Sequence, residues 1–183
     1  GYEKNEIKSQ HLAADFAGCF GRSVRDNFPW STPAGLIRGR LLNIIKLEFD
    51  FTPGQRNAAA STHGIIIPES IPGKGYFFMK NVTGARRDST LFKLDFAAVT
   101  NYMRKAIKDV AYTYLFERNN AANRDAFKSV AERVLAGISA AGQIGHYEVK
   151  CDDTQPDNQN PEKLYAEIKI QPLDSIKSIN LLV

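Results

Sequence analysis

The chain is poor in the residues that build metal sites and disulfide frameworks. Its 183 residues include two cysteines and three histidines. None of the histidines, His11, His63 and His146, lies at metal-ligand spacing from another histidine or a cysteine, which argues against a zinc site. Cys19 and Cys151 lie far apart, and we expect free thiols in a reducing compartment rather than a disulfide. We expect no cofactor.

The sequence also lacks a set of side chains that would carry out catalysis. No local pattern places a cysteine beside a histidine as a thiol–imidazole pair, so buried structural cysteines are the simpler interpretation. Residues 73–75 read Gly-Lys-Gly, but the longer spacing of a phosphate-binding loop is absent, which favours a plain turn. The adjacent carboxylates Asp152 and Asp153 end a predicted strand, where a solvated loop is expected and weak cation binding is the alternative. We predict that the chain is not an enzyme.

Long apolar runs and strong charge clusters are missing too. No stretch approaches the roughly 20 apolar residues that cross a bilayer, and no secretory signal is recognisable, so we expect no membrane insertion. The formal net charge is +4 and the pI is about 9.0. Basic residues are scattered, whereas nucleic-acid binders concentrate them in a stripe. We expect no direct nucleic-acid contact, and a basic module for a polyanion or nucleic acid is the alternative function.

What is present suits a globular protein with a core of its own. Hydrophobic residues make up 43% and charged residues 24% of the chain, which are ordinary proportions for a soluble globular domain. A chain of 183 residues is also long enough to bury a sizeable core. Because it starts with Gly1 rather than methionine, we expect a fragment of a longer protein.

The first half of the chain predicts short elements. Leu12, Phe16 and Phe20 recur at steps of four, which is typical of a short helix over residues 11–20. Apolar and polar residues alternate over residues 39–51, which predicts a half-buried strand. The other elements expected here are a polar loop at 22–30, an alanine-rich helix at 55–62 ended by Gly64, a buried strand at 65–67, a loop at 69–75 and a strand at 76–80.

The second half predicts two long helices followed by strands. Apolar residues recur at helical spacing from Asp95 to Tyr114 and again from about Ala121 to Ala141, where Asn119, Asn120 or Asn123 can cap the second helix. Alternating patterns predict strands at 147–151, 164–171 and 178–183. Strands, two substantial helices and then strands favour an α+β fold over repeated βαβ units.

Ordered blocks along the chain resemble a known family. The blocks are AADFAG at 13–18, WSTPAG at 30–35, RG at 38–39, LNIIKL at 42–47, QR at 55–56, GKG at 73–75, LFERNN at 115–120, YEVKCD at 147–152, IQP at 170–172 and SI at 175–176. In order and spacing they are similar to the contractile tail sheath proteins, most closely those of large T-even-type phages. The similarity extends from about residue 13 to residue 183.

The resemblance implies a domain organisation and a function. Residues 1–12 would be a lead-in segment and 13–183 the conserved inner sheath domain, with a helical part at 91–142 and C-terminal strands at 146–183. Its small mixed β-sheet, packed with two long helices, would be completed by strands exchanged between subunits. The chain would be a structural subunit that polymerises as stacked hexameric rings around an inner tail tube and contracts to drive the tube through the target cell envelope.

The same resemblance implies partners and a location. We expect a homo-oligomer of helically stacked hexameric rings that contacts the inner tail tube protein and the baseplate and tail terminator proteins. The protein would reside in the phage tail of the virion after assembly in the host cytoplasm.

Two groups of site residues follow from the resemblance. A strand at a chain end pairs within its own subunit or adds to the sheet of another subunit. The expected inter-subunit strand comprises Ile176, Ser178, Ile179, Asn180, Leu181, Leu182 and Val183. The expected tube-facing helix, whose alternative is an ordinary solvated face, presents Arg124, Lys128 and Arg133 to an acidic tube surface.

Overall fold

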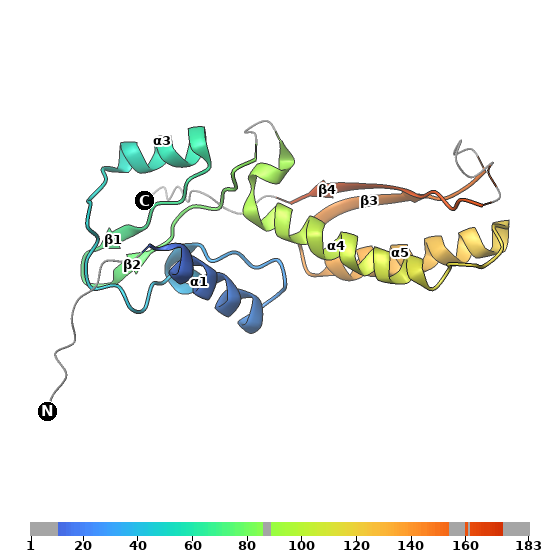
Figure 1. Ribbon diagram of the computed structural model, residues 1–183, viewed down its shortest axis with the longest axis horizontal. Coiled ribbons are helices and arrows are strands. Elements are labelled where there is room, and N and C mark those ends of the chain that lie inside the picture. The colour runs from blue at the N-terminus through green and yellow to red at the C-terminus, as the bar shows by residue number, and fades with distance from the viewer. Residues whose placement is uncertain (1–10, 86–88, 154–159, 161, 174–183) are drawn as a thin grey trace, which may run out of the picture. The chain divides into compact units, whose positions relative to one another are not determined.

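The computed structural model describes residues 11–85, 89–153, 160 and 162–173. The chain divides into two compact units, Gly1–Ala98 and Val99–Val183. Helices accompany a separate two-stranded antiparallel sheet in each unit (Figure 1). The predicted α+β class is confirmed, and all strand pairs of the described ranges are antiparallel. No helix in those ranges is both long and apolar enough to cross a membrane.

The first unit is built around one small apolar cluster. Cys19, Leu41 and Phe78 are buried together, and Phe16 meets Phe78 edge-on with the ring centres 5.1 Å apart. The elements of this unit are α1 (Ala13–Asp26), α2 (Gly35–Arg38), α3 (Pro53–His63), β1 (Glu69–Ile71), β2 (Gly75–Phe77) and the 3-10 turn η1 (Thr90–Phe92).

Helix α1 is longer than predicted, so the predicted loop at 22–30 is wrong over its first half. Cys19 and Ser23 lie four residues apart and are both buried, which continues the inner face of the helix by one more turn. The Ser23 hydroxyl donates to the backbone oxygen of Thr32 at 3.2 Å. Arg25 and Asp26, which made this stretch look loop-like, lie on its exposed side.

The predicted strand at 39–51 is wrong, although its alternation is genuine. Only its first residues find backbone partners: the Phe78 N–H donates to the Gly39 oxygen at 2.8 Å, and the Leu41 N–H to the Tyr76 oxygen at 2.9 Å. Beyond this point Ile45 and Phe49 are 73% and 66% exposed. A strand needs a partner for its backbone, and for most of this segment the described part of the chain offers none.

Helix α3 is confirmed, with the expected end at Gly64 and a start two residues earlier than predicted. Thr52 and Gln55 form a capping box, and Gly64 ends the helix in the left-handed conformation with φ of 64°. The predicted strand at 65–67 is wrong, because the Ile65 N–H still bonds to the Ala59 oxygen at 3.2 Å as part of the helix end. Pairing starts instead at Glu69, inside the predicted loop.

The second unit places a helix against a longer hairpin. Helix α5 (Ala121–Ala140) buries Phe127, Ala131, Leu135 and Ile138 and packs on β3 (Ile144–Lys150) (Figure 1). Strand β3 pairs with β4 (Glu167–Pro172), with an irregularity between Ile144 and His146. Helix α4 (Leu94–Tyr112) crosses the boundary between the units. Both long helices and the first two C-terminal strands are confirmed; the third predicted strand, at 178–183, lies outside the described residues.

Candidate assembly surface

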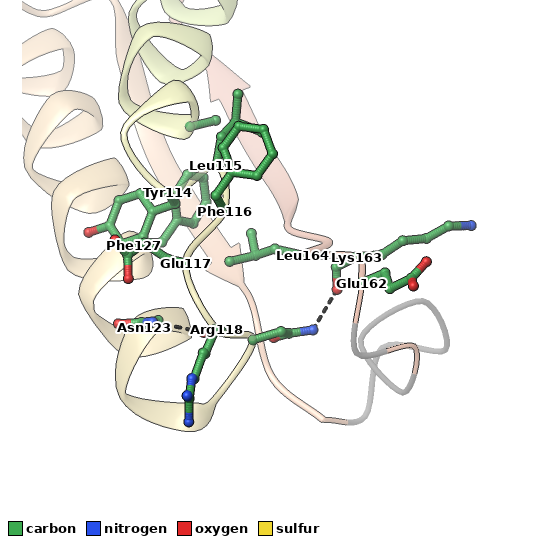
Figure 2. A pocket seen from close by; sticks show the side chains of 12 residues that line it. Tyr114, Leu115, Phe116, Glu117, Arg118, Asn123, Phe127, Glu162, Lys163 and Leu164 are labelled. Atoms are coloured by element: carbon green, nitrogen blue, oxygen red, sulfur yellow. Dashed lines mark hydrogen bonds between the residues drawn. The ribbon is translucent and has the colours of Figure 1, made fainter.

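The LFERNN block forms the connection between α4 and α5 and one wall of a surface hollow. The hollow measures about 220 Å³. Figure 2 shows Tyr114, Phe127 and Asn123 on one side of it and Glu162, Lys163 and Leu164 on the other. Sites for small molecules measure about 300–1,000 Å³. The hollow is therefore sized for a side chain rather than for a cofactor.

Phe116 is the most unusual residue of this connection. Its φ is 68°, and it is the one non-glycine residue of the described chain with a positive φ. A residue with a Cβ pays about 1–2 kcal/mol for this conformation. The side chain gains nothing in return within its own chain, because its relative exposure is 104%.

Asn120 begins α5 and fixes where the connection ends. Its side-chain oxygen accepts a hydrogen bond from the Asn123 N–H at 2.8 Å. The Asn123 side chain in turn donates to the Arg118 backbone oxygen at 2.7 Å (Figure 2). Of the three asparagines that the sequence offered as caps, Asn120 is the cap, and Asn123 ties the connection to the first turn of the helix.

Asn119 and Arg124 link this connection to the segment between β3 and β4. The Asn119 amide donates to the backbone oxygens of Asn160 at 3.2 Å and Lys163 at 2.6 Å. Its oxygen accepts from the Arg124 guanidinium at 2.9 Å, which also pairs with the Asp153 carboxylate. This network holds both walls of the hollow at a fixed spacing.

The Arg124 guanidinium belongs to the interior of the second unit. Arg124 is 7% exposed, whereas the Asp153 side chain is 77% exposed. The guanidinium charge also reaches the buried thiol of Cys151. Burial raises the pKa of this thiol, and the Arg124 charge acts in the opposite direction. Cys19 and Cys151 are both free and buried, which confirms the expectation of unpaired thiols.

The three basic residues predicted to face a tube do not share one face of α5. A helix makes one turn in about 3.6 residues, so the nine positions from Arg124 to Arg133 place them on opposite faces. Arg133 is exposed, and Lys128 is half-buried with its ammonium 4.0 Å from Glu132. Arg124 is engaged within its own chain and presents no free charge.

The residues of the expected inter-subunit strand, Ile176 and Ser178 to Val183, lie outside the described residues. The sheet that they would extend is described. Strands β3 and β4 pair with each other, and neither has a second strand neighbour in the described ranges. An unpaired strand edge presents backbone N–H and C=O groups that can pair with another strand.

Sequence reasoning missed Asn119, Asp153 and Phe116 as parts of this surface. The signal that could have found Asn119 and Phe116 is their place in the LFERNN block; Asp153 carried no comparable signal. Three side chains able to hold a metal ion do not come together anywhere in the part of the chain described here.

Comparison with known proteins identifies the family. The sequence model of the phage tail sheath C-terminal domain matches residues 87–183. The chain is similar to the tail sheath protein of Enterobacteria phage T4, with 32% identity over 172 residues, 93% of this chain and 26% of that protein. Its identity to the tail sheath protein of Vibrio phage KVP40 is 29% over the same coverage. The chain thus spans about a quarter of the length of these relatives.

Solved structures share the fold at low sequence identity. The anti-feeding prophage baseplate chain matches with a TM-score of 0.81 and 16% identity, over 94% of this chain and 49% of that one. The contracted helical sheath of the same particle matches with a TM-score of 0.79 and 16% identity, over 94% of this chain and 50% of that one. The contracted sheath of an extracellular contractile injection system, PVC, matches with a TM-score of 0.77 and 15% identity, over 92% of this chain and 49% of that one. The chain belongs to the phage tail sheath C-terminal domain family, a family of structural proteins rather than enzymes.

Proposed function

We propose that the chain is the assembling inner domain of a contractile tail sheath subunit. Subunits polymerise as stacked hexameric rings around an inner tail tube and, on contraction, drive the tube through the target cell envelope. The sheath then also contacts the baseplate and tail terminator proteins. It resides in the virion tail, after assembly in the host cytoplasm.

The observation that carries this proposal is the family match over residues 87–183. It covers α4, α5 and the β3–β4 hairpin, and so includes the whole candidate surface. Proteins that share the fold are found in a helical sheath and in a baseplate. The hollow, at about 220 Å³, is smaller than the usual small-molecule site.

Negative-stain microscopy of the purified chain tests the proposal directly. Rings or hollow tubes are the expected result. A protein that stays monomeric at every concentration tested, and does not join tubes formed by a complete sheath protein, would contradict it.

The proposed inter-subunit strand, residues 176–183, is tested in the same assay. A two-stranded hairpin is marginally stable alone, and a third strand satisfies one of its open edges. We expect deletion of residues 176–183 to leave a folded monomer, judged by circular dichroism, that no longer forms tubes. If tubes of normal length form without these residues, the segment pairs only within its own subunit.

The proposed tube contact rests on Arg133, because Arg124 is engaged within its chain and Lys128 lies nearer to the Arg124 side of α5 than to Arg133. Exposed ion pairs are worth about 0–1 kcal/mol each and are screened by salt, which suits a sheath that must release the tube. We expect Arg133→Glu to weaken co-sedimentation with tube protein at low salt. Unchanged co-sedimentation would assign Arg133 to a solvated face. Arg104→Glu is the matched control, since it reverses an exposed charge on α4.

One observation favours the second candidate, a basic module for a polyanion. Arg104, Lys105 and Lys108 lie on one exposed side of α4, and no ion pair involves them within the described ranges. The Lys108 ammonium lies 5.6 Å from the centre of the Tyr112 ring. This candidate predicts binding of a labelled oligonucleotide at low salt that Lys105→Glu abolishes.

A further inference from the structure

We propose that Phe116 is a contact between two copies of this chain, its side chain being buried against a neighbouring copy in the assembled polymer. The inference rests on the proposed polymerisation and names a residue at one of the contacts between copies. In the isolated chain Phe116 has both a strained backbone and a fully exposed apolar side chain.

The first cost is conformational. Phe116 adopts φ of 68° at a position where glycine or asparagine is free of strain or nearly so. Strained backbone persists where the surrounding structure imposes it. Here the Glu117 N–H bonds to the Tyr114 oxygen at 3.2 Å, and the Asn123 side chain holds the Arg118 oxygen at 2.7 Å. The turn therefore fixes the direction of the Cα–Cβ bond of Phe116, which points the side chain away from its own chain.

The second cost is solvation. Phe116 is 104% exposed, and its neighbour Leu115 is 57% exposed. Leu164, on the facing wall of the hollow, is 36% exposed (Figure 2). An exposed aromatic ring beside other exposed apolar groups is the arrangement found at the centre of protein interfaces, where aromatic residues carry much of the binding energy.

The charges around this group indicate what covers it. Glu117 and Arg118 lie on one wall, and Glu162 and Lys163 on the other, so each wall carries one charge of each sign. A rim of zero net charge does not attract a polyanion or a strongly acidic surface. It complements a surface that carries charges of both signs, and a second copy of this chain, with 24 basic and 20 acidic residues, offers both.

The geometry of a helical polymer limits which surface of the neighbouring copy Phe116 can contact. A contact that joins the same patch on both copies closes into a dimer, whereas an open helical polymer needs two different patches. Phe116 of one copy therefore meets a different apolar surface on the next. Exposed apolar side chains available for this role in the first unit include Ile37 at 92% and Ile45 at 73%.

The substitution Phe116→Gly separates assembly from folding. Glycine is unstrained at positive φ, and the substitution removes a side chain that is fully exposed in the monomer. We expect the melting temperature to stay the same or rise. The critical concentration for polymerisation should rise by about 10- to 100-fold, since burial of one phenyl ring is lost. Phe116→Tyr keeps the ring and should stay near the wild-type value, as should Tyr112→Ala, which removes another exposed ring.

The outcomes keep this inference distinct from the proposed function. Wild-type protein that never polymerises overturns the proposed function. Wild-type and Phe116→Gly proteins that polymerise at equal concentrations overturn the contact alone. As a direct readout, replacement of Phe116 by the photoreactive p-benzoylphenylalanine should link neighbouring copies covalently in irradiated polymers. Polymers without such links, while the same replacement at Tyr112 produces them, also overturn it.

Discussion

Arg124 illustrates how the role of a charged residue depends on its surroundings. From the sequence it is one of three basic residues on a helix, equivalent to Lys128 and Arg133. In the structure its guanidinium is buried and bonded to Asn119 and Asp153, and it joins α5 to the segment that follows β3. Sequence spacing could have separated Arg124 from Arg133, because nine residues correspond to about two and a half helical turns.

The Arg124–Asp153 pair predicts which of the two residues contributes more to the free energy of unfolding. Replacing Asp153 leaves a buried guanidinium without its counter-charge, whereas replacing Arg124 leaves a carboxylate that is already 77% exposed to water. We expect Asp153→Ala to cost about 1–3 kcal/mol, and Arg124→Met, which keeps the apolar stem, to cost less. Urea unfolding of the two variants compares them. A larger loss for Arg124→Met would show that packing of the stem outweighs the charge.

At the scale of elements, sequence periodicity predicted the helices, because helices are determined by interactions between residues a few positions apart. Helices α3, α4 and α5 were predicted because alanine content, apolar stripes and end residues such as Gly64 and Asn120 are encoded within a few positions. The strand at 39–51 failed because alternation describes the side chains and says nothing about whether a partner strand exists. The hollow could not be predicted, since Asn160 and Lys163 meet the connection before α5 only through tertiary contacts, those of the Asn119 side chain.

The cap of α5 gives a prediction at this scale. Asn120 satisfies the Asn123 N–H and sets the start of a helix that carries the core of the second unit. We expect Asn120→Ala to destabilise the protein by about 1 kcal/mol, and Asn120→Asp to be nearly neutral because aspartate caps equally well. Thermal unfolding followed by far-ultraviolet circular dichroism measures both. Equal losses for alanine and aspartate would mean that the amide itself, rather than the cap, is required.

At the scale of the whole molecule, the two compact units each have a core of their own. Cys19, Leu41 and Phe78 form the cluster of the first, and α5 with β3 forms that of the second. Such a construction favours units that unfold separately rather than in one transition.

The single tryptophan makes separate unfolding measurable. Trp30 lies in the first unit, is 6% exposed and stacks on Phe28 with ring centres 5.3 Å apart, so its fluorescence reports that unit. Asp153 lies in the second. We expect Asp153→Ala to lower the urea midpoint seen by circular dichroism while leaving the fluorescence midpoint unchanged. Thr52→Ala, which removes the cap of α3 in the first unit, should instead lower the fluorescence midpoint. If Asp153→Ala shifts both midpoints equally, the two units unfold as one cooperative body.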